Sequence, residues 1–206
     1  SHQNTMDKNS NTWKEIMSLA KNDPKKMDDT TILKGVGLDD DTIKKIEEDS
    51  FNAAKEELKV QVNFINKSSN EDPKHKYLDD SGMDLRANLD DNIIIKSGEI
   101  KLIPTGLHFE LPESMEIQVR PRSGLAAKNG ITVLNTPGTV DRGYTGEIKV
   151  ILINLGKDDF RVGHGDRIAQ AVVSPVISGR WCKLNKKNKL GETNRSDGGF
   201  GSTGIN

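Results

Sequence analysis

Hydrophobic residues over most of the chain follow the short period of β-strands. Beyond residue 58, apolar runs recur at close intervals, and Gly or Pro separates most of them. Many short strands divided by turns are typical of an all-β sandwich or barrel. The runs are Ile93–Lys96, Ile100–Pro104, Leu107–Leu111, Glu116–Arg120, Ile131–Leu134, Ile148–Leu155, Phe160–Val162 and Ile168–Val176, after a half-buried alternating strand at Val60–Ile65. We therefore predict an all-β core, a jelly-roll-like barrel or sandwich, over residues 58–184.

The first 57 residues show the helical period instead, and we expect a small α-helical extension there. A capping-box pattern at Thr12–Glu15 precedes an apolar stripe that ends at Pro24. Pro24 opens a second short helix, and Asp39–Asp41 supply N-cap candidates for a third. The third helix carries along one side Ile43, Ile46, Phe51, Ala54 and Leu58. This stripe is expected to pack on the core, on a second copy, or on a protein partner of residues 10–57.

Two shorter segments complete the expected organisation. Ser123–Asn129 is the one helical turn predicted inside the β core, with Gly130 as the residue that ends it. Residues 185–206 are polar and rich in Gly, and we expect a flexible C-terminal arm there. Ser1 and His2 are interpreted as a cloning remnant.

Charge and cysteine content narrow the class of protein. The 206 residues include 30 Lys and Arg against 31 Asp and Glu, so overall basicity does not favour a nucleic-acid partner. A single cysteine, Cys182, excludes an internal disulfide and fits a reducing compartment. No apolar run reaches the length of a membrane span, and no signal-peptide pattern opens the sequence. We expect an intracellular protein, cytoplasmic or nuclear, that does not bind membranes.

The stretch richest in candidate chemistry is Asn135–Gly146, which reads N-T-P-G-T-V-D-R-G-Y-T-G between two predicted strands. Its Gly and Pro residues predict a tight hairpin that carries one carboxylate, Asp141, and one aromatic ring, Tyr144. Unpaired backbone groups at the mouth of a hairpin can read the polar edge of a flat base. We therefore predict a site for a nucleoside with a reacting group attached.

The C-terminal arm contains a second candidate site, R-S-D-G-G-F-G-S-T-G at residues 195–204. Glycines leave backbone N–H groups free to wrap oxyanions, and Arg195, Ser202 and Thr203 add polar donors. Phe200 stands among these glycines and is exposed unless something flat stacks on it.

Three further clusters are weak signals when taken one at a time. Arg120–Gly124 leads from a strand into the predicted helical turn, so that Ser123 and the following N–H groups suit an anion beside Arg122. Gly165–Gln170 reads G-D-R-I-A-Q and presents Gln170. Gly82–Ala87 reads G-M-D-L-R-A, with Asp84 as its only acid.

Together and in this order, the five motifs closely resemble those of the trimeric deoxyuridine triphosphatase (dUTPase) family. The resemblance runs from about Lys59 to the end and leaves the helical extension outside it. It implies a dUTPase-like β-clip fold and Mg²⁺-dependent hydrolysis of dUTP to dUMP and pyrophosphate. That activity limits uracil incorporation into DNA and supplies dUMP for thymidylate synthesis. It also implies a homotrimer whose active sites are shared between subunits.

The resemblance also implies a role for each site residue. Asp141 would be the general base, and Asp84 would hold Mg²⁺ through water. Tyr144 would lie under the deoxyribose, and Phe200 would stack on uracil as part of a lid formed by the arm. The remaining substrate-binding residues it implies are Arg122, Ser123, Gly124, Asn135, Gly138, Val140, Gly146, Gln170, Arg195, Gly201, Ser202 and Thr203.

Two alternatives stay open at this stage. A dCTP deaminase, or a bifunctional enzyme, shares the fold and would use a Glu after the hairpin, where Glu147 stands. A regulatory protein gated by nucleotide would use the helical extension as its effector. Thr136-Pro137 departs from what many relatives carry after the Asn, so local uracil contacts can differ.

Overall fold

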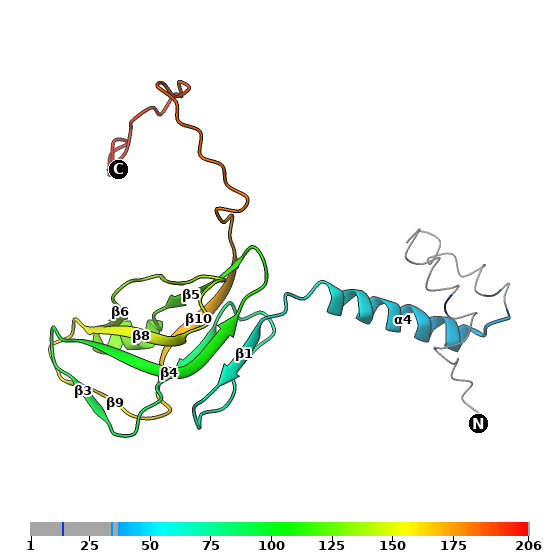
Figure 1. Cartoon of the computed structure of the whole chain (residues 1–206), viewed down its shortest axis with the longest axis horizontal. Coiled ribbons are helices and arrows are strands. Elements are labelled where there is room, and N and C mark those ends of the chain that lie inside the picture. The colour runs from blue at the N-terminus through cyan, green and yellow to red at the C-terminus, as the bar shows by residue number, and fades with distance from the viewer. Residues whose placement is uncertain (1–13, 15–33, 35–36, 206) are drawn as a thin grey trace. The chain divides into compact units, whose positions relative to one another are not determined.

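The chain divides into two units, Ser1–Gln61 and Val62–Asn206. The computed structural model describes residues 14, 34 and 37–205 (Figure 1). The helices expected around Thr12 and Pro24 lie outside these residues. Among the described helices, none combines the length and apolarity that crossing a bilayer requires.

The first unit contains helix α4 (Asp40–Glu57). The Asp39 carboxylate caps its N-terminus and accepts a hydrogen bond from the Thr42 N–H at 2.7 Å, which lowers the pKa of Asp39. The N-cap prediction is thus confirmed. Ile43 and Ile46 are buried, but Phe51 is 62% exposed, so burial of the apolar stripe ends in the first half of the helix.

The second unit is built from two four-stranded sheets and one two-stranded sheet, with every pairing antiparallel. Figure 1 shows β1, β4 and β8 side by side in the first sheet. That sheet has the order β1 (Asn63–Asn66), β4 (Ile100–Glu110), β8 (Glu147–Asn154) and β6 (Ile131–Val133). The second has the order β2 (Met83–Arg86), β10 (Arg167–Pro175), β5 (Met115–Arg120) and β7 (Gly138–Val140). The small sheet pairs β3 (Ile93–Ile95) with β9 (Phe160–Val162). The predicted all-β core is confirmed.

One hydrophobic core joins the two larger sheets, because alternate side chains of their strands are buried together. In β8, for example, Ile148, Val150 and Leu152 are buried in this way. Each such side chain contributes about 1.5–3 kcal/mol relative to an exposed one. Two polar residues, Thr105 and Asn154, are also fully buried, and both are hydrogen-bonded to backbone carbonyls. The core therefore contains polar groups that are satisfied rather than orphaned.

Helix α5 (Ser123–Asn129) is the expected helical turn, and its end is confirmed in detail. Gly130 adopts the left-handed conformation with φ 67°, which favours glycine. A Cβ atom at this position would also lie only 2.6 Å from the Gly156 nitrogen. Both observations explain why Gly stands there.

Several strand predictions were wrong in their bounds. The two runs expected at residues 100–104 and 107–111 form one strand, β4, whose register shifts between Pro104 and His108. The half-buried strand expected at residues 60–65 begins only at Asn63, and its Ile65 is 59% exposed. Strands β2 and β7 were not expected, because both are short and lie inside motifs interpreted for their chemistry.

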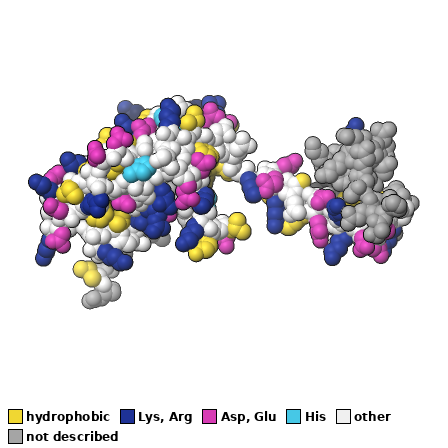
Figure 2. Space-filling model, turned by 90° about the horizontal axis from the view of Figure 1, so that it is seen from below, with side chains coloured by type: hydrophobic (Ala, Val, Ile, Leu, Met, Phe, Trp, Pro, Cys, Tyr) yellow, Lys and Arg dark blue, Asp and Glu magenta, His cyan; other side chains and the backbone are white. Residues whose placement is uncertain are grey.

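Positive and negative side chains are interspersed over the visible face of the second unit (Figure 2). This mixture fits the near-zero net charge of the chain.

Candidate functional site

The segment from Asn135 to Gly146 connects the two larger sheets. Its flanking strands, β6 and β8, pair with each other as the arms of a hairpin would. Between them, however, Gly138–Val140 forms β7, which pairs with β5 of the other sheet. The prediction of a simple tight hairpin was therefore wrong: the chain leaves one sheet, adds a strand to the second and then returns.

The turn after β7 holds Tyr144 in a fixed position. The Tyr144 N–H donates to the Asp141 carbonyl at 3.0 Å, and the Tyr144 hydroxyl donates to the Glu147 carbonyl at 2.8 Å. The phenol ring lies directly over Gly146, where a Cβ atom would come within 2.7 Å of the ring. Glycine at position 146 is therefore required for this placement of the aromatic ring.

A cavity of about 240 Å³ opens beside this turn. It brings together five of the residues predicted from the sequence to bind or convert a nucleotide, namely Asn135, Gly138, Val140, Asp141 and Tyr144. This volume lies below the range of about 300–1,000 Å³ that is usual for ligand sites. A Cβ atom at Gly138 would lie 3.3 Å from the Asn135 amide nitrogen, so glycine leaves room for that side chain.

A second cluster forms on three neighbouring strands of the other sheet. Gln170 on β10 lies opposite Asp84 on β2 and, on its other side, opposite Arg120 on β5. Its amide donates to the Pro121 carbonyl at 2.9 Å. A Cβ atom at Gly82 would lie 2.3 Å from the amide oxygen of Gln170, so glycine at position 82 leaves room for the Gln170 side chain.

Two arginines lie beside Asp84. Arg122 Nε is 3.5 Å from Oδ1, and Arg167 Nη1 is 3.8 Å from Oδ2. Asp84 and Arg122 were predicted from the sequence, whereas Arg167 was missed. Its signal was present in the G-D-R-I-A-Q motif, but the pairing across β2 and β10 that brings it to Asp84 is not visible in sequence.

The start of α5 adjoins this cluster. Ser123 and Gly124 are exposed and follow Arg122, which is the N-cap residue and makes no side-chain capping bond. The first bond of the helix is donated by Ala126 to the Arg122 carbonyl. The backbone N–H groups of the first turn thus remain available to an anion.

Within one chain, the cavity of Asp141 and the cluster of Asp84 lie apart. Val140 pairs with Ile117 on one side of β5, whereas Gln170 pairs with Arg120 on its other side. The rise along β5 from Ile117 to Arg120, together with the spacing of the strands on both sides of it, separates Val140 from Gln170 by about 14 Å. A reacting phosphate held by the Asp84 cluster would therefore not reach Asp141 of the same chain.

The C-terminal motif is folded only on itself. Arg195 Nε donates to the Gly198 carbonyl at 2.7 Å, and the Ser202 N–H donates to the Gly199 carbonyl at 3.1 Å. Phe200 is 114% exposed. Within the described part of the chain, no hydrogen bond or ion pair joins residues 183–205 to the β core.

A family model described as dUTPase matches residues 68–204. This match covers more than half of the chain and includes all five motifs. The chain belongs to the dUTPase family.

Relatives and solved structures agree with this assignment. The deoxyuridine 5'-triphosphate nucleotidohydrolase of Brucella abortus (strain 2308) is 55% identical over 135 residues, which are 65% of this chain and 84% of the relative. The corresponding protein of Rickettsia bellii (strain RML369-C) is 60% identical over 125 residues, 61% and 81% of the two chains.

Two phage dUTPases share the fold at low sequence identity. A mutant of the phage 80alpha dUTPase is 20% identical and matches with a TM-score of 0.62, covering 69% of this chain and 98% of that one. A mutant dUTPase from phage phi11 of S. aureus, in a structure that describes the coordination of a structural Mg(II) ion, gives a TM-score of 0.57 at 17% identity, covering 63% of this chain and 98% of that one.

Glu147 of this dUTPase-family chain, the residue that a deaminase would use, has a structural partner. Its carboxylate accepts a hydrogen bond from the Gly106 N–H at 3.1 Å, which ties the start of β8 to the irregular part of β4. The side chain is half-buried on the wall of the cavity beside Tyr144.

Among the described residues, no group of three or more His, Cys, Asp or Glu side chains is arranged to hold a metal ion. A metal held mainly by water and substrate phosphates needs no such cage. Mg²⁺ is commonly bound in this way through one or two carboxylates. The single carboxylate of Asp84 fits that type of site.

Proposed function

We propose that this dUTPase-family chain hydrolyses dUTP to dUMP and pyrophosphate, with Asp141 as the general base. The observation that carries the proposal is the cavity that gathers Asn135, Asp141 and Tyr144 beside β7.

The nucleoside would occupy the cavity beside Tyr144. The ring of Tyr144 is held by its bond to the Glu147 carbonyl and by contact with Gly146, so it offers a rigid surface under the deoxyribose. A rigid ring at this point leaves no room for a 2′-hydroxyl. Asn135 and the backbone groups from Gly138 to Gly146 would pair with uracil, and a cytosine would leave those groups unpaired.

Asp141 would activate the attacking water. Its side chain is exposed, and among the described residues no hydrogen bond or ion pair engages its carboxylate. An unengaged carboxylate can accept a proton from the water that attacks the α-phosphorus.

The triphosphate would lie along the Asp84 cluster. Arg122, Ser123, Gly124 and Gln170 would neutralise or hydrogen-bond its oxygens, since phosphoryl transfer depends mainly on positioning and charge. Asp84 would hold Mg²⁺ through water. When bound, the metal ion supplies positive charge to the phosphate oxygens.

A complete site requires more than one chain. Because about 14 Å separates the two halves within one chain, the phosphate cluster of one subunit would serve the Asp141 cavity of another. We infer a homotrimer in which the arm of a further subunit, with Arg195, Phe200, Gly201, Ser202 and Thr203, closes over the nucleotide.

The test is a panel of nucleoside triphosphates assayed for both pyrophosphate and ammonia. dUTP should release pyrophosphate in the presence of Mg²⁺, while UTP, dTTP and dCTP should release much less. Ammonia from dCTP would show a deaminase instead, and equal rates for dUTP and UTP would contradict the assigned role of Tyr144.

A further inference from the structure

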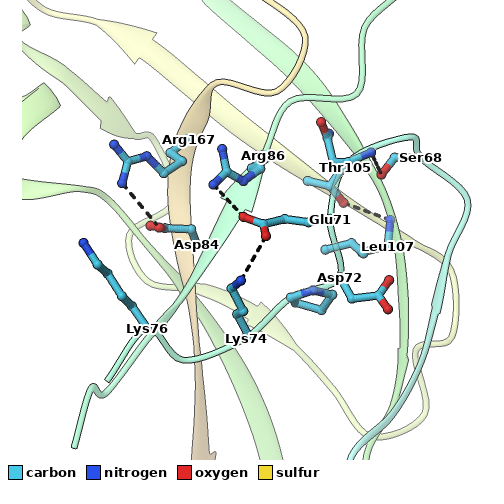
Figure 3. A pocket seen from close by; sticks show the side chains of 12 residues that line it. Ser68, Glu71, Asp72, Lys74, Lys76, Asp84, Arg86, Thr105, Leu107 and Arg167 are labelled. Carbon is cyan, nitrogen blue, oxygen red and sulfur yellow. Dashed lines mark hydrogen bonds and ion pairs between the residues drawn. The ribbon is translucent and has the colours of Figure 1, made fainter. Parts of the chain in front are cut away.

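A second cavity, of about 310 Å³, lies between β2, β4 and the loop of residues 68–76 (Figure 3). Four cationic side chains line it, namely Lys74, Lys76, Arg86 and Arg167, together with three acids, Glu71, Asp72 and Asp84. Asp84 also belongs to the phosphate cluster described above. The cavity therefore shares Asp84 with the proposed triphosphate site.

The loop that forms the outer wall is held by specific bonds. Asn66 Nδ2 donates to the Asn70 carbonyl at 3.0 Å, and Asn70 Nδ2 donates to the Ala87 carbonyl at 3.0 Å. Ser68 packs against Gly106, where a Cβ atom would lie 2.8 Å from the Ser68 nitrogen. These bonds fix the loop against β2 and β4.

Glu71 ties two of the four cations to this wall. Its carboxylate lies 3.0 Å from Lys74 Nζ and 3.0 Å from Arg86 Nη2. The hydrogen bond and charge of Lys74 lower the pKa of Glu71, with a smaller contribution from Arg86. Arg86 also donates to the Gly165 carbonyl at 3.0 Å. Lys74 and Arg86 are thus already committed to structural partners.

Lys76 differs from the other cations of the cavity. Of the residues that line it, all of which are described, Lys76 is the only cation without an ion pair. Its ammonium lies 5.3 Å from the centre of the Tyr77 ring. In Figure 3 its side chain extends towards the side of the cavity where Asp84 and Arg167 lie. With Arg122 and Arg167 both beside Asp84, the cations on this side outnumber the acids.

We propose that this cavity is an anion subsite for the pyrophosphate end of the substrate, with Lys76 as a further substrate-binding residue. The proposal rests on the proposed function, because it extends the triphosphate beyond Arg122 and Gln170. Two adjacent phosphate groups match the excess positive charge that Lys76 and Arg167 place beside Asp84. An ammonium on a pre-formed wall can contact phosphate as a point charge.

This subsite would hold the product as well as the substrate. Pyrophosphate remains bound by Lys76 and Arg167 after the bond to the α-phosphorus breaks, so it should inhibit the enzyme competitively with dUTP. Lys76 acts here by binding and takes no part in proton transfer.

The experiment is a calorimetric titration of the full chain with inorganic pyrophosphate in Mg²⁺ buffer. Lys76→Ala should raise Kd by about 10-fold, the low end for a charge-assisted hydrogen bond. Lys76→Arg, which keeps the charge, should bind nearly as well as the parent chain. Lys96→Ala is the matched control, because Lys96 is exposed and lies outside the cavity. Its substitution changes the net charge of the chain by the same amount as Lys76→Ala.

Two results would overturn the proposal. One is a Kd for Lys76→Ala equal to that of the parent chain. The other is an equal loss in Lys96→Ala, which would show a general effect of net charge. Both results are Kd values for pyrophosphate and need no turnover, so they remain valid for a chain that fails to hydrolyse dUTP. Failure of the proposed subsite can therefore be distinguished from failure of the proposed function.

Discussion

Tyr144 lies over Gly146 so closely that the smallest side chain at position 146 would collide with its ring. The hydroxyl end of the same ring is fixed by the Glu147 carbonyl at 2.8 Å. The two contacts hold the aromatic ring on the wall of the cavity that contains Asp141. In the proposed site, selectivity for a deoxyribose would therefore depend on the absence of a Cβ atom at position 146, two residues after Tyr144.

Gly146→Ala should displace Tyr144 and lower kcat/KM for dUTP. Misplacement of a substrate-positioning group by about 1 Å can cost up to about 100-fold. The rate with UTP should fall less, because the displaced ring no longer excludes the 2′-hydroxyl. Steady-state kinetics with both nucleotides measure this change in preference.

Gly143→Ala is the matched control for this substitution. Gly143 lies in the same turn, but a Cβ atom there meets nothing within 4 Å. It should leave the dUTP to UTP preference unchanged. If both variants change the preference equally, the turn as a whole is responsible and the contact between Tyr144 and Gly146 is not.

Asp141→Asn should keep nucleotide binding and lose catalysis. The amide preserves size and much of the hydrogen bonding, yet it cannot take a proton from water. Loss of a general base costs about 10²–10⁴-fold in kcat. Single-turnover pyrophosphate release measures the rate, and titration with a non-hydrolysable dUTP analogue confirms binding. Retention of more than about a tenth of the parent kcat would exclude Asp141 as the base.

The separation of Asp141 from Asp84 predicts complementation between two inactive variants. Asp141→Asn and Asp84→Asn chains should each be inactive alone. Random mixed trimers would contain sites that take Asp141 from one subunit and Asp84 from its neighbour. In an equal mixture that dissociates and reassembles, about one quarter of the sites should be intact.

The regained activity of the mixture measures this sharing directly. Sites contained within one chain would give no recovery at all, and light scattering should show the mass of a trimer. A mixture that is trimeric but inactive would therefore contradict the shared site, not the assembly.

Local signals in the sequence were sufficient for much of the fold. Gly130 ended α5 as expected, Asp39 capped α4, and the apolar alternation of β8 gave nearly correct bounds. These features depend on residues that are close together in the chain. The family motifs were equally visible, because each is continuous in sequence.

Features that depend on distant pairing could not be predicted. β7 forms because Gly138–Val140 pairs with β5 of the other sheet. A three-residue segment inside a motif rich in turn residues does not indicate that pairing. Arg167 reaches Asp84 only through the register of β10 on β2. The loop of residues 68–76 is simply polar in the sequence, and its position on the wall of the second cavity depends on the ion pair between Glu71 and the distant Arg86.

The C-terminal arm should act as a lid that orders only on bound nucleotide. Phe200 is fully exposed, and among the described residues no hydrogen bond or ion pair joins residues 183–205 to the β core. Ordering such a segment costs about 1–2 kcal/mol per residue. Stacking on uracil and contacts from Arg195, Ser202 and Thr203 to phosphate would offset that cost. Phe200→Ala should therefore raise KM and lower kcat while leaving the trimer and its Tm unchanged.

Ile205→Ala provides the control for the arm, because Ile205 is equally exposed but lies outside the motif. Its kinetics should match those of the parent chain. Trypsin should cleave at the lysines between residues 183 and 189 rapidly in the free enzyme, and a non-hydrolysable dUTP analogue with Mg²⁺ should slow the cleavage. Truncation after Lys189 should reduce activity more than Phe200→Ala, because the phosphate contacts are removed as well. A cleavage rate that does not change with the analogue would mean that the arm is not a lid, and the exposure of Phe200 would then need another explanation.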